Sequence, residues 1–192
     1  ALLIGMGERY DVVIEARSEG ARRMIAVPLG KKGRAVAVLR TGPTTGRVAA
    51  PDAPFTMPPR IVSYTDLRSA DTPPRTASAA RETRLTLDMK MGSGYVWTIG
   101  GRPFDDAPAI EAGRGEPQRY VMANRTMMPH PMHLHGHSFR PTAGGPLKDT
   151  IMVPPMREVA IDWLPDNPGS WAFHCHNAYH AAAGMMRRVE VF

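Results

Sequence analysis

One stretch of this chain governs its interpretation: His174-Cys175-His176-Asn177-Ala178-Tyr179-His180. Side chains alternate between the two faces of a β-strand. If residues 170–176 form a strand, Cys175 therefore points to one face while His174 and His176 point to the other. A single tripeptide would then serve two sites on opposite sides of one backbone.

The remaining histidines lie in a second window, His130-Pro131-Met132-His133-Leu134-His135-Gly136-His137. All seven histidines and the only cysteine of the chain fall in these two windows, which random scatter would not produce. Imidazole, thiolate and thioether groups gathered in this way indicate a transition-metal site, and they favour copper.

Strand parity divides the ligands into two groups. Cys175, His180 and Met185 come from one loop, and a thiolate with two imidazoles and a weak thioether is the ligand set of a blue electron-transfer copper site. The second imidazole has to come from the other window. There, His130 has the opposite parity to His133 and His135, so it can face this blue site.

The same parity places four imidazoles on the opposite side, those of His133, His135, His174 and His176. Four imidazoles without a thiolate suit one or more further copper ions. Cys175 and the two histidines that flank it would then form a short covalent bridge, through which an electron could pass between the sites.

Two other interpretations explain only part of the pattern. Structural histidines around a buried cysteine, which usually behaves as a small hydrophobic residue, would not gather in two windows. Zinc would accept the imidazoles and the thiolate, but it has no need of the thioether of Met185.

Both windows resemble motifs of a known family. Residues 130–139, His-Pro-Met-His-Leu-His-Gly-His-Ser-Phe, are similar to the third histidine motif of the multicopper oxidases. Residues 174–186, which contain His-Cys-His, a later histidine and Gly-Met-Met, are similar to the fourth. The family includes laccases, cuprous oxidases and copper-resistance oxidases, and the resemblance covers the C-terminal portion of such proteins.

The resemblance implies a role for each ligand. Type 1 copper would be bound by His130, Cys175, His180 and Met185. Type 2 copper would be bound by His133, and the binuclear type 3 copper by His135, His174 and His176. A complete enzyme of the family holds four copper ions. His174, Cys175 and His176 would be the catalytic residues that pass electrons between the sites.

Three other positions are interpreted through the same resemblance. The position of His137 is not a ligand in the family, so we expect it to support the ligands instead. Asp149 recurs after the first motif, where we expect a structural hydrogen-bonding residue. Methionine at position 185 implies a moderate redox potential, as in the bacterial enzymes.

The implied activity is a copper-dependent oxidase. It would couple the one-electron oxidation of a reducing substrate, either a phenol or a metal ion such as Cu(I), to the four-electron reduction of dioxygen to water. The alternative is a non-catalytic blue-copper electron-transfer cupredoxin. That protein would need only the type 1 ligands, and it leaves the other four histidines without a purpose.

The resemblance also implies that a domain is missing. The trinuclear cluster of the family needs eight histidines, four of which come from an N-terminal cupredoxin domain. We therefore expect this chain to be the C-terminal part of an oxidase that is active only with that domain, on the same or another chain. Residues 7–12, Gly-Glu-Arg-Tyr-Asp-Val, resemble a strand near the end of the family's middle domain.

The pattern along the chain predicts an all-β protein. Apolar, β-branched runs at 9–16, 24–29 and 34–40 predict antiparallel strands, and we assign residues 1–40 to the end of a middle cupredoxin domain. Seven prolines within 41–75 predict an extended inter-domain linker. Further short strands are expected from about residue 81, with a helical turn over 177–183 ended by Gly184. Residues 76–192 would thus form a complete C-terminal domain, a cupredoxin-like Greek-key β-sandwich.

Charge and composition limit the classes of binding partner that we expect. The net charge of +6 comes from 24 basic and 18 acidic residues that are spread along the chain, without the basic stripe that nucleic-acid binding requires. One cysteine excludes an internal disulfide. The chain has no transmembrane run, and the family resemblance implies export to the periplasm or the exterior.

Overall fold

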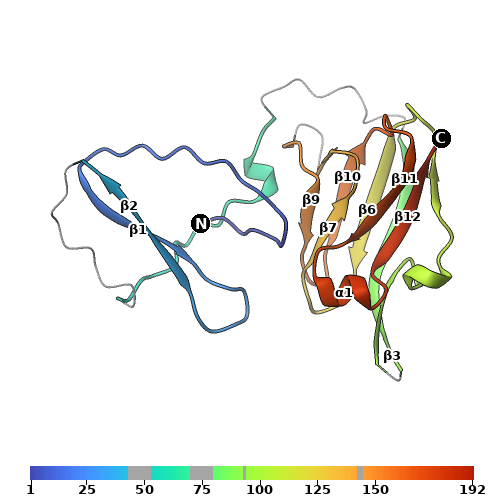
Figure 1. Ribbon diagram of the computed structural model, residues 1–192, viewed down its shortest axis with the longest axis horizontal. Coiled ribbons are helices and arrows are strands. Elements are labelled where there is room, and N and C mark those ends of the chain that lie inside the picture. Colours follow the sequence, from blue (N-terminus) through green and yellow to red (C-terminus); the bar gives the residue numbers. More distant parts are fainter. Residues whose placement is uncertain (43–52, 70–79, 93, 142–144) are drawn as a thin grey trace. The chain divides into compact units, whose positions relative to one another are not determined.

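The computed structural model describes the 192 residues except 43–52, 70–79, 93 and 142–144. The described chain divides into two compact units (Figure 1). The larger unit combines Ala1–Tyr10 with Arg60–Phe192, and the smaller unit is Asp11–Pro59.

Two five-stranded sheets make up the larger unit. The first has the strand order β4 (Tyr95–Ile99), β3 (Arg81–Met91), β6 (Gln118–Asn124), β10 (Glu158–Trp163), β8 (Phe139–Arg140). The second has the order β5 (Ile110–Ala112), β12 (Met186–Val191), β11 (Gly169–Cys175), β7 (His130–Leu134), β9 (Thr150–Val153). Neighbouring strands pair antiparallel, except that β3 pairs parallel with β6 and β5 parallel with β12.

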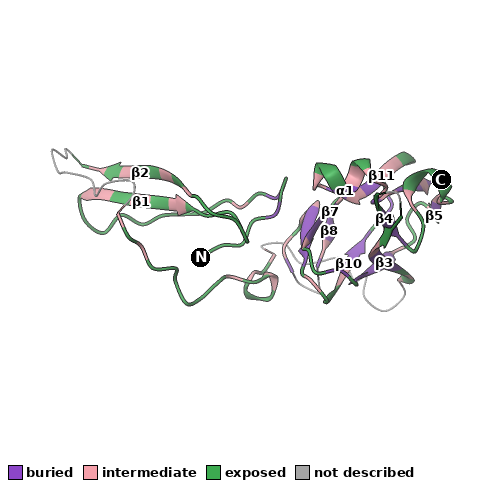
Figure 2. Cartoon of the chain, turned by 90° about the horizontal axis from the view of Figure 1, so that it is seen from below, coloured by how far each residue is buried: buried purple, intermediate pink, exposed green. Residues whose placement is uncertain are grey.

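Alternating side chains of both sheets form one hydrophobic core. On β3, Leu85 and Leu87 are fully buried while Thr86 between them is half-buried. The ring centroids of Tyr120 on β6 and Phe173 on β11 lie 5.6 Å apart, so the two sheets meet face to face. Buried residues accordingly line the inside of this unit (Figure 2). The expected all-β sandwich is confirmed.

The helical segments of the larger unit are short. They are η1 (Tyr64–Asp66), η2 (Phe104–Asp106) and α1 (Ala178–Ala182). The expected turn of helix is confirmed in α1, where the Asn177 side chain accepts a hydrogen bond from the backbone of Tyr179. Gly184 follows with φ +112°, where a Cβ would lie 2.6 Å from the carbonyl oxygen of Trp97. No helix among the described residues is long and apolar enough to cross a membrane.

The smaller unit contains an antiparallel hairpin of β1 (Gly20–Ala26) and β2 (Ala35–Thr41). None of its described residues is buried, so this unit has no core of its own. The strand expected at 24–29 instead ends at Ala26, because Pro28 cannot donate a ladder hydrogen bond.

The prediction of a strand over residues 9–16 was wrong. These residues have no strand partner in the described part of the chain. The carbonyl of Arg9 instead accepts a hydrogen bond from the Lys148 ammonium at 3.1 Å. The division into residues 1–40, 41–75 and 76–192 stays a prediction, and four of the linker prolines, Pro43, Pro51, Pro73 and Pro74, lie outside the described residues.

The buried position of Leu87 can be tested by truncation. We expect Leu87→Ala to lower the free energy of unfolding by about 2–5 kcal/mol, because it leaves a cavity in the core. Leu147→Ala is the control, since Leu147 is 58 % exposed, and its effect should stay within about 0.5 kcal/mol. Denaturant unfolding of both variants measures the difference, and equal losses would contradict this account of the core.

Candidate metal centre

Three elements bring one thiol and two imidazoles together. Cys175 ends β11, His130 begins β7 and His180 lies in α1, and all three are buried. The two Nδ1 atoms are 3.1 Å apart. The Cys175 Sγ lies 3.8 Å from Nδ1 of His130 and 3.6 Å from Nδ1 of His180. These donor atoms all lie within 4.8 Å of one another, so one ion can bind between them. We call this group, together with Met185, the cysteine site.

Met185 is tied to the cysteine site through the backbone. The N–H of Cys175 donates to the Met185 carbonyl at 3.1 Å, and the N–H of Met185 donates to the His180 carbonyl at 2.9 Å. Met185 itself is fully buried. The loop that carries three of the expected ligands therefore closes on itself.

A buried polar network orients His130. The Asn124 amide nitrogen donates to the carbonyls of Met128, Val153 and Pro154, which leaves its oxygen to accept from the Thr126 hydroxyl at 2.9 Å. The Thr126 oxygen is then free to accept from Nε2–H of His130, 2.8 Å away. With the proton on Nε2, the lone pair of Nδ1 points to the cysteine site.

Two further contacts shape the surroundings of this site. The Trp97 ring stacks on His180 with centroids 3.9 Å apart and meets His130 edge-on at 5.3 Å. The backbone N–H of Asn177 donates to Sγ of Cys175 at 3.4 Å. Both imidazoles are thus held by packing, and the sulfur has one fixed donor.

Burial keeps the donors of the cysteine site neutral. Burial, with the like charge of His180, lowers the pKa of His130 to about 3. Burial also lowers the pKa of His180 and raises the pKa of the Cys175 thiol to about 12. A cation that binds here must displace the thiol proton, because the thiolate is the ligand form.

The other four histidines form a second group on the opposite face of β11. Ring centroids of His133 lie 4.7 Å from His135 and 4.5 Å from His176. Those of His174 lie 5.1 Å from both His135 and His176. We call these residues the four-histidine cluster. His133 and His174 face each other in the register of β7 and β11.

Backbone carbonyls fix the tautomers of three of these rings. Nδ1 of His133 contacts the Asp149 carbonyl at 2.8 Å, Nδ1 of His174 the Cys175 carbonyl at 3.0 Å, and Nδ1 of His176 the Met6 carbonyl at 2.9 Å. A carbonyl only accepts, so each Nδ1 carries the proton and each Nε2 keeps a lone pair. This is the arrangement in which imidazoles bind metal ions.

His137 lies apart from the cluster. Its side chain is buried, its Nδ1 donates to the His135 carbonyl at 3.1 Å, and its ring meets Trp163 edge-on. The preceding Gly136 has φ +67°, and a Cβ there would lie 2.6 Å from the Trp171 ring. The loop that leaves His135 therefore requires glycine at this position.

A sequence model of the multicopper oxidase family matches residues 76–192, the part of the chain that contains both groups of ligands. The chain belongs to the multicopper oxidase family. Copper is therefore the metal that this family membership implies, and a soft thiolate with neutral imidazoles is a donor set that fits it.

Several relatives within the family are similar to this chain. Multicopper oxidase MmcO of Mycobacterium tuberculosis is 36% identical over 99% of this chain, which spans 38% of that protein. A copper resistance protein A homolog of Pseudomonas syringae is 37% identical over 69% of this chain, which spans 23% of that protein. The crystal structure of the McoA multicopper oxidase from Aquifex aeolicus has 28% identity and a TM-score of 0.56, covering 64% of this chain and 31% of that one.

The fold of the family is shared with more distant structures. A laccase from Botrytis aclada superimposes with a TM-score of 0.65 over 81% of this chain and 36% of that chain, at 21% identity. The expected cupredoxin-like fold is thereby confirmed.

Some supporting residues were not predicted from the sequence. Asn124, Thr126 and Trp97 are close to the ligands in space, but neither composition nor spacing distinguishes them from other strand residues. The structure also places Asp149 where a hydrogen-bonding residue was expected, since its carboxylate binds Arg9 and its carbonyl accepts from His133.

The role of the Thr126 hydroxyl can be isolated by substitution with valine. We expect Thr126→Val to weaken copper binding at the cysteine site about 10- to 100-fold, because His130 loses the partner that fixes its tautomer. Thr98→Val is the matched control, since its buried hydroxyl donates only to the carbonyl of Asp88. A copper titration followed by the blue absorption measures both, and equal affinities would exclude this role.

Proposed function

We propose that this chain is the C-terminal, copper-binding part of an oxidase that transfers electrons from a reducing substrate to dioxygen. The observation that carries the proposal is the placement of residues 174–176. The thiol lies on the inner face of β11, in the cysteine site, and the two imidazoles lie on the outer face, in the four-histidine cluster.

Each group of residues has a distinct role in this proposal. The cysteine site, His130, Cys175, His180 and Met185, would bind type 1 copper. In the four-histidine cluster, His133 would bind type 2 copper, and His135, His174 and His176 would bind the type 3 pair. Bound copper supplies the one-electron chemistry and the reduction of dioxygen to water.

The protein contributes position and environment. The sandwich core excludes water from Cys175, whose side chain is fully buried. The backbone joins Cys175 directly to His174 and His176, so the path between the two sites is covalent and only a few bonds long. Three backbone carbonyls hold the imidazoles of His133, His174 and His176 with Nε2 directed away from the hydrogen-bonded side.

We further propose that the four-histidine cluster is completed by an N-terminal cupredoxin domain, on the same or another polypeptide. This proposal is supported by the exposure of the contact between Nε2 of His135 and Nε2 of His174, which leaves room for further ligands at the cluster. It is also supported by the relatives, of which this chain spans 38% or 23%. The hairpin of β1 and β2, which has no buried residue, fits the end of a middle domain that needs other strands to form a core.

The proposal extends to the class of reducing substrate and to the location of the enzyme. Relatives named copper resistance protein A favour a metal ion such as Cu(I), and relatives named laccase favour a phenol. We propose that the enzyme acts in the periplasm or outside the cell, as a copper-resistance function would require. An electron-transfer cupredoxin would need only the cysteine site.

Replacement of the thiol tests the proposed function. In the copper-loaded protein with its N-terminal domain, we expect Cys175→Ser to abolish the blue absorption and the substrate-dependent consumption of oxygen. The near-ultraviolet band of the type 3 pair should persist, because the four-histidine cluster remains. A wild-type protein with a blue band but without oxygen consumption would overturn the oxidase assignment in favour of electron transfer.

The proposed role of Met185 as a weak thioether ligand has its own test. We expect Met185→Leu to raise the reduction potential of the type 1 copper, because leucine removes the weak thioether ligand. Met186→Leu is the matched control, since the neighbouring methionine lies in β12 and is only half-buried. Redox titration of the blue band measures both potentials, and a shift of equal size in the control would contradict the assignment of Met185 as a ligand.

A further inference from the structure

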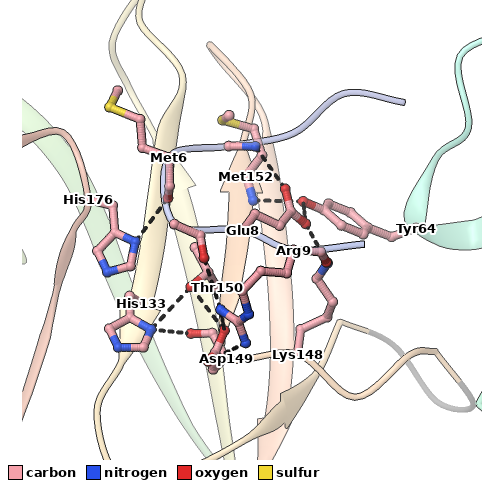
Figure 3. Close-up of polar contacts among 12 residues, drawn as sticks. Met6, Glu8, Arg9, Tyr64, His133, Lys148, Asp149, Thr150, Met152 and His176 are labelled. Carbon is pink, nitrogen blue, oxygen red and sulfur yellow. Dashed lines mark hydrogen bonds and ion pairs between the residues drawn. The ribbon is translucent and has the colours of Figure 1, made fainter. Parts of the chain in front are cut away.

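Residues 5–10 lie against the four-histidine cluster although they are far from it in sequence (Figure 3). This segment belongs to the same compact unit as the sandwich. It contacts His176 directly and reaches His133 through Asp149, and the buried carboxylate of Glu8 attaches it to the sandwich.

The first route ends at His176. The Met6 carbonyl accepts from Nδ1 of His176 at 2.9 Å, across 170 positions of sequence. Gly7 follows with φ +76°, and a Cβ at this residue would lie 2.0 Å from that same nitrogen. The segment can approach the imidazole this closely only with glycine at position 7.

The second route ends at His133. The guanidinium of Arg9 binds the Asp149 carboxylate through two hydrogen bonds of 2.9 and 2.8 Å. The Asp149 carbonyl accepts from Nδ1 of His133 at 2.8 Å, and the Thr150 hydroxyl lies 3.1 Å from the same nitrogen. Arg9 also donates to the Gly7 carbonyl, so both routes are joined within the segment.

The carboxylate of Glu8 attaches the segment to the sandwich. Its oxygens accept from the Gly5 N–H at 2.9 Å, from the Tyr64 hydroxyl at 2.8 Å and from the Lys148 ammonium at 2.8 Å. The Tyr64 oxygen in turn accepts from the N–H of Met152 in β9. Glu8 and Lys148 have side chains that are 0 % and 8 % exposed, so this ion pair is buried and fully hydrogen-bonded at the carboxylate.

We propose that residues 5–10 position the four-histidine cluster, with Gly7 and Arg9 as positioning residues. The Met6 carbonyl sets the tautomer and orientation of His176, and Arg9 sets those of His133 through Asp149. The hydrogen bonds described above lead from the segment to His176, Asp149 and Lys148 and not to the cysteine site, so the ligands of that site should be unaffected. The effect on copper rests on the proposed function, whereas the effect on the imidazoles does not.

Gly7 gives the sharper test. In the copper-loaded protein with its N-terminal domain, we expect Gly7→Ala to weaken copper binding in the four-histidine cluster about 10- to 100-fold. The type 2 electron paramagnetic resonance signal and the near-ultraviolet band should fall, while the blue band is retained. Gly101→Ala is the matched control, because Gly101 has φ +77° but a Cβ there meets nothing within 4 Å.

Arg9 tests the second route without steric disturbance. We expect Arg9→Gln to weaken the type 2 signal more than the near-ultraviolet band, because the two hydrogen bonds from Arg9 to Asp149 support His133. Arg84→Gln is the control, since Arg84 is similarly exposed and forms an ion pair with Glu158 in the same unit. Arg9→Lys keeps the charge and should restore part of the signal.

A readout on the metal-free protein separates this inference from the proposed function. Nitrogen NMR of labelled histidine should show His176 protonated at Nδ1 in the wild type and in Gly101→Ala, but not in Gly7→Ala. Identical spectra for the two glycine variants, or a loss of blue and near-ultraviolet bands in equal proportion, would overturn the inference. A wild type without any copper bands would overturn the proposed function. The NMR result alone would then decide whether residues 5–10 position the imidazoles.

Discussion

The alternation of side chains along β11 is the constraint on which both sites depend. Because consecutive residues of a strand face opposite ways, Cys175 enters the core while its two neighbours reach the outer face. Strand β7 lies beside β11 in the same sheet and carries histidines of both parities. It therefore supplies a histidine to each face of β11. Neither site could shift along the strand without exchanging the environment of the thiol for that of the imidazoles.

In both sites, neighbouring polar groups set the direction of the imidazole nitrogens. In the cysteine site, burial suppresses the charged imidazolium forms, and a hydroxyl within a buried amide network directs His130. In the four-histidine cluster, backbone carbonyls perform the same task. Two opposite tautomers therefore occur within one domain, with Nδ1 of His130 available on one face of β11 and Nε2 of His133, His174 and His176 on the other. The surrounding polar groups, rather than the histidines alone, determine which nitrogen is offered.

The sequence predicted which of the histidines lie together and which lie beside Cys175, because parity and spacing are local properties that survive folding. The longer strands after residue 81 and the turn of helix after residue 176 were predicted for the same reason, whereas the short strands β5, β8 and β9 were not. Residues 9–16 were predicted wrongly, because an apolar run indicates a strand only where a neighbouring strand is present. Thr126 and Arg9 were not recognised as supports. Arg9 meets Asp149 across 140 positions, and a contact at that separation leaves no periodic signal in either segment.

The closed loop between Cys175 and Met185 has a consequence for how such a site can change. Its hydrogen bonds join the first and last residues of the loop to each other and to His180, so the loop has a fixed length. An insertion or deletion would move a ligand, but an exchange of one side chain would leave the backbone ring intact. Exchanges of single side chains in this loop are therefore compatible with the backbone ring as long as the spacing from Cys175 to His180 and Met185 is kept.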